Sequence, residues 1–308
     1  MLTLTHWRGL RDAARGASVA MGNFDGVHLG HRSVIDLAAA QPAPLGVVTF
    51  EPHPREFFSP ATPAFRLMNA EARAHRMEKL GVTRLYELPF DADLAGMSAE
   101  EFAREVLCKG LGVAHVTVGA DFRFGKGRLG NADILHDFGA HCGFGVTIAP
   151  LLHIGGLEIS STAIRTALAD GRPRDAAAML GHWHRIEGEV IHGEKRGRAL
   201  GFPTANMRVQ DLHLPRLGVY AVKVDVLTGP QAGSYIGAAS LGVRPMFGEN
   251  QPNLETYLFD FDGDLYGKHL SVAFIDYLRP ERKFDGLPQL LEQMANDCTR
   301  AREILVQI

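Results

Sequence analysis

Two patterns of secondary structure divide this 308-residue chain near residue 181. In the first part, short apolar runs rich in β-branched residues alternate with segments of helical composition, as at residues 17–24, 28–40 and 45–50. In the second part, β runs follow one another across turns, with nothing of helical length between them. These runs are 185–192, 218–227, 234–241, 254–261 and 269–278. Such a change predicts two domains of different fold class.

The alternating part, residues 1–180, predicts an α/β domain: a doubly wound parallel sheet with right-handed crossovers. Ser98 followed by Glu101 forms a capping box, which predicts a helix over residues 99–107. Parallel sheets of this kind bind ligands at the carboxyl ends of their strands, near the topological switch point. The second part, residues 181–308, predicts an antiparallel barrel or sandwich, and apolar residues at helical spacing predict a terminal helix over residues 287–306.

Composition narrows the class of protein. The formal net charge is −3, so no overall field favours nucleic acid or an anionic membrane, and we expect neither as a partner. The three cysteines form no CxxC pair, and their odd number argues against a disulfide framework. Charged residues interrupt the N-terminal segment before it could form a signal peptide, and no apolar stretch is long enough to cross a bilayer. A cytoplasmic enzyme is expected, and the oligomeric state is not indicated.

Residues 21–31 read MGNFDGVHLGH, where a predicted strand ends, a turn follows and a helix begins. Gly22 and Gly26 allow close approach of the backbone to a ligand, and a helix N-terminus suits phosphate. His28 and His31 share one helix face, from which both can donate to phosphate oxygens. The segment is neither GxGxxG nor a Walker loop. Two alternatives stay open: two surface histidines on a capped helix, or a zinc site that lacks its third ligand.

A second polar segment, residues 159–165 (ISSTAIR), opens a predicted helix after the last strand of the same domain. Ser160, Ser161 and Thr162 supply hydroxyls and capping groups, and Arg165 can form a forked contact with phosphate. An ordinary helix cap with a surface arginine would give the same pattern. Combined with HxGH, the segment resembles the nucleotidylyltransferase superfamily related to class I aminoacyl-tRNA synthetases.

Residues 49–54 (TFEPHP) and 119–127 (GADFRFGKG) also follow predicted strands. With GNFDGVHLGH they closely resemble the FMN adenylyltransferase module of bacterial bifunctional riboflavin kinase/FAD synthetases. Phe122 and Phe124 could instead be core residues at strand spacing, and His53 could merely shape the Pro-His-Pro turn. The resemblance implies that ATP is bound by Gly22, Asn23, Phe24, Asp25, Gly26, His28, His31, Ser161, Thr162 and Arg165, and the flavin by His53, Asp121, Phe122 and Phe124, with His28, His31 and Arg165 acting in catalysis.

In the second half, residues 201–206 read GFPTAN, and an extended backbone would project Thr204 and Asn206 to the same side. A hydroxyl and an amide oxygen are suitable ligands for Mg²⁺ already chelated by ATP. Residues 192–197 (HGEKRG) could fold over phosphates or form a solvated hairpin, and PTAN alone could be a hydrogen-bonded turn. Glu255, in LETYLFDF, is placed on a strand, where it could be a general base or simply face outward.

Together these segments resemble the riboflavin kinase module over about residues 183–306. The resemblance implies a six-stranded antiparallel barrel with a C-terminal helix and Glu255 as the base for the riboflavin 5′-hydroxyl. One segment departs from the family: residues 237–245 read GAASLGVRP, with Ser240 and Val243 where asparagine and threonine are frequent. The implied ligands of ATP and Mg²⁺ are Gly193, Lys195, Gly197, Thr204 and Asn206, with Thr204 and Asn206 at the metal, and those of the flavin are Arg279 and Phe284.

The two resemblances cover nearly the whole chain in the expected order. They imply a bifunctional enzyme in which the domain of residues 181–308 phosphorylates riboflavin to FMN with ATP. The domain of residues 1–180 would adenylylate FMN to FAD and release pyrophosphate, with Mg²⁺ as cofactor. The alternatives are a catalytically inactive flavin-binding or flavin-sensing protein, and a transferase that joins another phosphate-bearing substrate to a nucleotide. The second alternative would leave PTAN unexplained.

Overall fold

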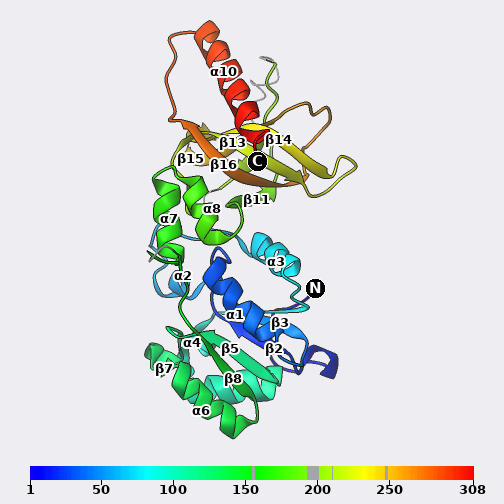
Figure 1. Cartoon of the computed structure of the whole chain (residues 1–308), viewed down its shortest axis with the longest axis vertical. Coiled ribbons are helices and arrows are strands. Elements are labelled where there is room, and N and C mark those ends of the chain that lie inside the picture. The colour runs from blue at the N-terminus through cyan, green and yellow to red at the C-terminus, as the bar shows by residue number, and fades with distance from the viewer. Residues whose placement is uncertain (155–156, 193–200, 210, 247–248) are drawn as a thin grey trace. The chain divides into compact units, whose positions relative to one another are not determined.

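The computed structural model describes residues 1–154, 157–192, 201–209, 211–246 and 249–308. The chain forms two compact units (Figure 1). The first unit comprises Met1–Pro63 and Arg73–Ser160, and the second comprises Ala64–Ala72 and Ser161–Ile308. The domain boundary between residues 180 and 181 stays a prediction about the two functional modules. Among the described residues, no helix combines the length and the apolar character of a membrane span.

The first unit is built on a six-stranded sheet of order β1-β4-β3-β2-β5-β8, in which every neighbouring pair is parallel. Its strands are β1 (Leu2–Leu4), β2 (Ser18–Met21), β3 (Leu45–Glu51), β4 (Arg84–Pro89), β5 (His115–Gly119) and β8 (Gly145–Ala149). From β2 the chain proceeds to β3 and β4 on one side, and later to β5 and β8 on the other. The switch point therefore lies between β2 and β5, and the predicted doubly wound sheet is confirmed.

Helices cover both faces of this sheet. The α-helices of this region are α1 (Leu29–Ala39), α2 (Pro54–Phe58), α3 (Ala70–Lys79), α4 (Ala92–Gly96), α5 (Ala99–Glu101) and α6 (Ala132–Cys142). A π-helix, η2 (Phe102–Leu111), continues α5, and the short elements are η1 (Asp12–Ala14), η3 (Lys126–Arg128), β6 (Arg123–Phe124), β7 (Gly130–Asn131), β9 (His153–Ile154) and β10 (Leu157–Glu158).

The capping box that predicted a helix after Ser98 is confirmed. Ser98 Oγ accepts from Glu101 N at 3.1 Å, and Glu101 Oε2 accepts from Ser98 N at 2.8 Å. The helix runs beyond residue 107 and ends at Gly112, whose φ of 54° is the left-handed conformation of a C-cap. Its π-helical geometry was not predicted, because the capping signal specifies only where a helix begins.

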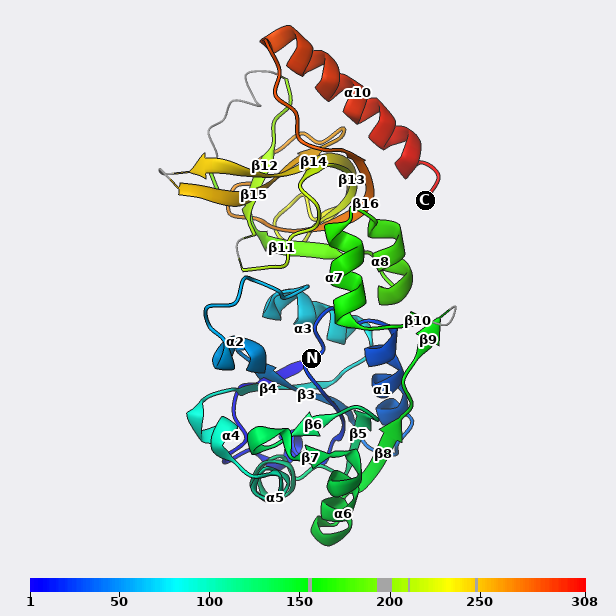
Figure 2. The same ribbon diagram turned by 90° about the vertical axis from the view of Figure 1, so that its left-hand side faces the viewer.

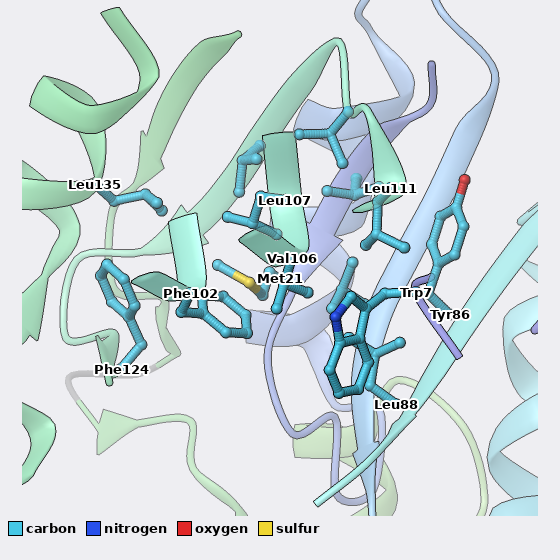
Figure 3. Packing of buried hydrophobic residues seen from close by; sticks show 14 of the residues in the cluster. Trp7, Met21, Tyr86, Leu88, Phe102, Val106, Leu107, Leu111, Phe124 and Leu135 are labelled. Carbon is cyan, nitrogen blue, oxygen red and sulfur yellow. The ribbon is translucent and has the colours of Figure 1, made fainter. Parts of the chain in front are cut away.

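The core of the first unit lies between the sheet and the helical layer of η2 and α6 (Figure 3). Met21 from β2 and Tyr86 and Leu88 from β4 pack with Phe102 and Leu107 of η2. Tyr86 Oη donates to Ala14 O at 2.6 Å, so the one polar atom of this buried ring has a partner. This packing holds the carboxyl end of β2 in place, where the MGNFDGVHLGH segment begins.

The second unit is an antiparallel sheet of order β11-β16-β13-β14-β15-β12 (Figure 2). Ile191 N donates to Asn206 O at 2.9 Å, an isolated bridge that brings the two ends of the sheet together. The fold is therefore a nearly closed barrel, which decides between the predicted barrel and sandwich. Its strands are β11 (Arg185–Glu189), β12 (Ala205–Arg208), β13 (Gly218–Val226), β14 (Gly233–Met246), β15 (Glu249–Leu258) and β16 (His269–Arg279).

Among the described residues after Ser160, three α-helices complete the second unit. The predicted terminal helix is α10 (Leu287–Leu305), and its Ala301 and Leu305 pack on the outside of the barrel against Val219 and Ile275. The helices α7 (Ser161–Ala169) and α8 (Pro173–Leu180) pack together around Leu67. This contact explains why a short piece from the first half of the chain belongs to the second unit.

Candidate active sites

The loop after β2 has an unusual backbone. Residues 17–24 were predicted as a strand, but β2 ends at Met21, because Phe24, Gly26 and Val27 have φ of 53°, 88° and 44°. Glycine adopts such angles without strain, whereas each other residue costs about 1–3 kcal/mol. The side chains of Phe24 and Val27 are 1% and 0% exposed, so packing holds this conformation. The loop is thus a fixed structure at the switch point of the sheet.

The two histidines of HxGH form one stacked unit. His28 is the N-cap of α1, and its Nδ1 accepts from His31 N at 3.2 Å. The two rings are 3.6 Å apart between centroids, with an interplanar angle of 14°. A Cβ at Gly30 would lie 3.1 Å from His28 Cε1, so the ring depends on the glycine beneath it. Since Nδ1 accepts, Nε2 is the nitrogen with which His28 can donate to a ligand.

The environment of His31 favours an uncharged ring. Burial, and secondly the neighbouring His28, hold the pKa of His31 well below its usual value. His31 Nδ1 is buried and has no hydrogen-bond partner among the described residues. An unpartnered buried nitrogen of this kind is costly, and a ligand that bonds to it would remove the cost. His31 therefore offers hydrogen bonding to a phosphate rather than a permanent positive charge.

The remaining predicted residues of the first unit surround the same edge of the sheet. Asp25 is buried, and Asn23 is exposed with its carbonyl oxygen accepting from Thr49 Oγ1 at 3.2 Å. His53 caps α2, because its Nδ1 accepts from Arg55 N at 3.0 Å. This contact gives His53 the turn-shaping role that was one of its two predicted uses. A role in ligand binding stays a prediction.

The GADFRFGKG segment follows β5, the neighbour of β2. Asp121 is exposed, Phe122 is partly buried, and Phe124 is 8% exposed and packs against Phe102 in the core. The rings of Phe122 and Phe124 stack at 5.7 Å. Phe124 is thus a core residue, as one of the two interpretations of this pair had it, while Phe122 is the more accessible ring. Their contact with flavin stays a prediction.

An aromatic cluster that the sequence reasoning missed lies beside the TFEPHP turn. Phe57 and Phe58 of α2 are 37% and 65% exposed, and both make edge-on contacts with Phe90, at 5.5 and 5.7 Å. Phe50 of β3 joins them from the core side, 5.8 Å from Phe90. The signal was the adjacent pair of phenylalanines in PREFF, directly after TFEPHP. Exposed aromatic rings suit a planar ligand.

Ser161, Thr162 and Arg165 lie on α7, in the second unit. Arg165 Nη2 donates to Thr162 Oγ1 at 3.2 Å, and the guanidinium lies 5.8 Å from the ring centroid of Phe65. The histidine pair belongs to the first unit. Convergence of the two segments on one nucleotide therefore stays a prediction.

A cavity of about 410 Å³ opens beside β12 in the second unit. Thr204 and Asn206, which were predicted to project together, both line it, and Asp262, Asp264 and Tyr266 line it as well. Its volume is within the range of small-molecule sites. β12 itself was not predicted as a strand. The predicted ligands Gly193, Lys195 and Gly197 lie outside the described residues.

Glu255 and Asn206 occupy paired positions on neighbouring strands, β15 and β12. Asn253, two residues before Glu255, donates from Nδ2 to Asn206 Oδ1 at 3.0 Å and to Glu255 Oε1 at 3.3 Å. Glu255 is therefore half-buried within a polar group, and its role as a general base stays a prediction. Ser240 of β14 pairs with Glu255 from the other side. Asn253 was missed, since an asparagine in a strand carries no motif of its own.

Of the two residues predicted to border the flavin in the kinase, Arg279 is held by the terminal helix. Arg279 Nη2 lies 2.7 Å from Asp297 Oδ2 of α10, and its guanidinium lies 5.8 Å from the ring centroid of Phe284. Val243, the second departure from the family pattern, is 42% exposed. A contact of Arg279 or Phe284 with flavin stays a prediction.

Comparison with known proteins agrees with this division of the chain. The family model of FAD synthetase matches residues 10–163, and that of riboflavin kinase matches residues 180–305. The bifunctional riboflavin kinase/FMN adenylyltransferase of Pseudomonas fluorescens is 41% identical over 300 residues, which cover 96% of this chain and 95% of the relative. The enzyme of the same name from Escherichia coli K12 is 38% identical and covers 94% of this chain and 92% of the relative.

A solved structure shows the same fold over most of the length. The crystal structure of a macrolide-efflux protein from Streptococcus pneumoniae has a TM-score of 0.81 and 31% sequence identity, with 96% of each chain covered. The two family models together span most of the sequence, and relatives covered over nine tenths of their length share more than a third of their residues with it. This chain belongs to the family of bifunctional riboflavin kinase/FMN adenylyltransferases.

Proposed function

We propose that this chain converts riboflavin to FMN and FMN to FAD, with ATP as the second substrate in both reactions. The first step takes place in the barrel and the second on the parallel sheet. One observation supports the assignment most directly: Asn206 of the PTAN segment lines a cavity and pairs with Glu255 on the next strand. A proton acceptor thus stands next to a group suited to ATP.

In the kinase step, Glu255 accepts the proton of the riboflavin 5′-hydroxyl as that oxygen attacks the γ-phosphorus of ATP. The bond between the γ-phosphorus and the bridging oxygen breaks, and ADP leaves. Thr204 and Asn206 hold the nucleotide, assisted by Gly193, Lys195 and Gly197 of the HGEKRG segment. Arg279 and Phe284 border the flavin.

The residues at this site fit an Mg²⁺ ion that is bound together with ATP. Thr204 and Asn206 supply hard oxygen donors at the cavity, whereas the described residues contain no group of three His, Cys, Asp or Glu side chains that could hold a metal alone. Bound there, Mg²⁺ would neutralise charge on the phosphates. The chain's own part is to present the Thr204 hydroxyl and the Asn206 amide oxygen at fixed positions.

In the adenylyltransferase step, a phosphate oxygen of FMN attacks the α-phosphorus of ATP, and pyrophosphate leaves. No covalent enzyme intermediate is required, so binding geometry supplies most of the catalysis. The loop of Gly22–Gly26 and the N-terminus of α1 receive phosphate, and His28 Nε2 and His31 donate to it. Ser161, Thr162 and Arg165 close on the same phosphates, and His53, Asp121, Phe122 and Phe124 border the flavin.

The proposal is tested by incubating the purified chain with riboflavin, ATP and MgCl₂ and separating the flavins by chromatography over time. We expect FMN to appear first and FAD to follow. A second reaction, started from FMN, should give FAD without a lag. Tight flavin binding without turnover would instead support a flavin sensor, and it would refute both proposed activities.

A further inference from the structure

Asn253 connects the two side chains on which the proposed kinase site depends. It precedes Glu255 by two residues on β15, so both side chains leave the same face of the strand. Asn253 is 4% exposed, and its Nδ2 lies within hydrogen-bond distance of both Asn206 Oδ1 and Glu255 Oε1. A carboxamide nitrogen carries two hydrogens, which is one for each of these oxygens.

The contact with Asn206 sets the direction of that amide. Asn206 Oδ1 accepts from Asn253, while Asn206 Nδ2 donates to Thr204 O at 3.3 Å. A carbonyl oxygen has two lone pairs, so Oδ1 keeps a second acceptor direction for a ligand. Without Asn253, rotation of the Asn206 amide by half a turn would exchange its oxygen and nitrogen at the site. The oxygen is the atom that a magnesium-bound nucleotide requires.

The contact with Glu255 acts on position. A donor held against one carboxylate oxygen restricts rotation of the side chain. A general base must lie within hydrogen-bond reach of the proton that it accepts. One buried amide therefore serves both the ATP ligand and the base.

A purely structural role would not explain why a residue that lowers the stability of this strand is present. Asparagine is depleted in strands, and Asn253 Oδ1 is buried without a hydrogen-bond partner among the described residues. A buried polar atom left unsatisfied costs about 1–3 kcal/mol. The presence of the amide despite this unfavourable free energy is explained if the proposed kinase site needs its two N–H groups.

We propose that Asn253 is a positioning residue for riboflavin phosphorylation: it orients Asn206 toward ATP and holds the carboxylate of Glu255 in place. The inference rests on the proposed function, which gives Asn206 and Glu255 their roles. Asn253 itself does not touch substrate in this scheme. It acts through its two neighbours.

The test compares Asn253→Ala with the isosteric Asn253→Asp, measuring kcat and the KM for ATP of the kinase reaction. Loss of the donor in Asn253→Ala should lower kcat about tenfold, because Glu255 is no longer held within reach of the proton that it accepts. Asn253→Asp should lose more, since it places a second carboxylate beside Glu255. KM for ATP should rise in both variants as Asn206 loses its orientation.

Thr256→Val is the matched control. Thr256 follows Glu255 on β15, is 0% exposed, and has an Oγ1 without a hydrogen-bond partner among the described residues. The substitution removes a buried hydroxyl that has no partner among the described residues, on the opposite face of the same strand, so kcat and the KM for ATP should stay within about twofold of the original. FAD formation from supplied FMN should be unchanged in all three variants.

A double-mutant cycle separates positioning from general damage to the barrel. If Asn253 acts on kcat through Glu255, Asn253→Ala should lower kcat less than threefold in a Glu255→Gln background, against about tenfold alone. Equal losses in both backgrounds, or an unchanged KM for ATP in Asn253→Ala, would overturn the inference. If Glu255→Gln itself leaves the kinase intact, the proposed site is wrong as well. If Glu255→Gln is impaired and Asn253→Ala is not, only the positioning role fails.

Discussion

The two proposed sites are built in opposite ways. On the parallel sheet, the proposed ligand contacts come from a loop with positive φ at Phe24 and Val27 and from the cap of a helix. On the barrel they come from side chains at paired positions of neighbouring strands, Asn206 and Glu255. Main-chain N–H groups at a helix end suit a phosphate chain, whereas a rigid strand suits a base that must meet one proton. Adenylyl transfer should therefore be sensitive to backbone shape, and phosphoryl transfer to side-chain chemistry.

The sharpest test of this difference is Glu255→Ala. Removal of a general base lowers the rate by about 10²–10⁴-fold, so FMN formation from riboflavin should fall within that range. FAD formation from supplied FMN should be unchanged, because Glu255 belongs to the other unit. Both rates are measured by flavin chromatography. Undiminished FMN formation would show that Glu255 is not the base.

His28→Ala should produce the converse result. Loss of one preorganised donor to a reacting phosphate costs about 10²–10³-fold, and loss of the N-cap adds local disorder at α1. FAD formation should fall by that factor while FMN formation continues. An equal loss of both activities would contradict the separation of the two sites.

The substitution Gly30→Ala, which adds one methyl group, tests whether FAD formation depends on the shape of the backbone. In Gly30→Ala the new Cβ would lie 3.1 Å from His28 Cε1, so the imidazole must move by a few tenths of an ångström. Displacements of this size at a positioned group should lower FAD formation about tenfold, with FMN formation unaffected. Gly96→Ala is the control, since nothing lies within 4 Å of a Cβ at that helical position. A rate for Gly30→Ala equal to that of Gly96→Ala would mean that the ring does not need its observed position.

The smallest expected effect concerns acid stability, because both units contain histidines whose pKa is lowered by burial. Burial lowers the pKa of His184 in the second unit to about 3, and that of His31 in the first unit also falls. Below pH 6.5 the unfolded chain binds a proton at His184 that the folded chain does not, so stability falls as the pH falls toward 3. The loss should be about 1 kcal/mol between pH 6.5 and 5.5.

Chemical denaturation of the His184→Gln variant at both pH values checks this expectation. The difference in unfolding free energy between the two pH values should shrink by about 1 kcal/mol, whatever the overall stability of the variant. His136→Gln, at a histidine with a side chain 64% exposed, should leave the difference as it is. An unchanged difference in His184→Gln would show that this ring is already protonated in the folded state.

The sequence predicted the structure best where the signal lies within a few neighbouring residues. Helix α7 begins at Ser161, within the segment that was predicted to open a helix, and the capping box at Ser98 forms with both hydrogen bonds. The HxGH segment was placed correctly at a strand-to-helix turn. Its neighbours in sequence carry the glycine and capping signals, which act over a few residues.

What the sequence did not predict depends on contacts between distant segments. Strand β12 has only Ala205–Arg208, and it is a strand because β15, about fifty residues later in the chain, pairs with it. The same pairing brings Asn253 to Asn206. The local sequence does not predict the positive φ of Val27 either, because a β-branched residue avoids that conformation unless packing imposes it.

The bridge that closes the barrel has a consequence for experiment. The amide of Ile191 donates to the main-chain oxygen of Asn206, a residue that lines the proposed kinase cavity. Any occupant that immobilises Asn206 should thus slow the exchange of that one amide hydrogen with deuterated solvent. The exchange rate of the Ile191 amide, measured by mass spectrometry, therefore reports whether the barrel has bound its nucleotide.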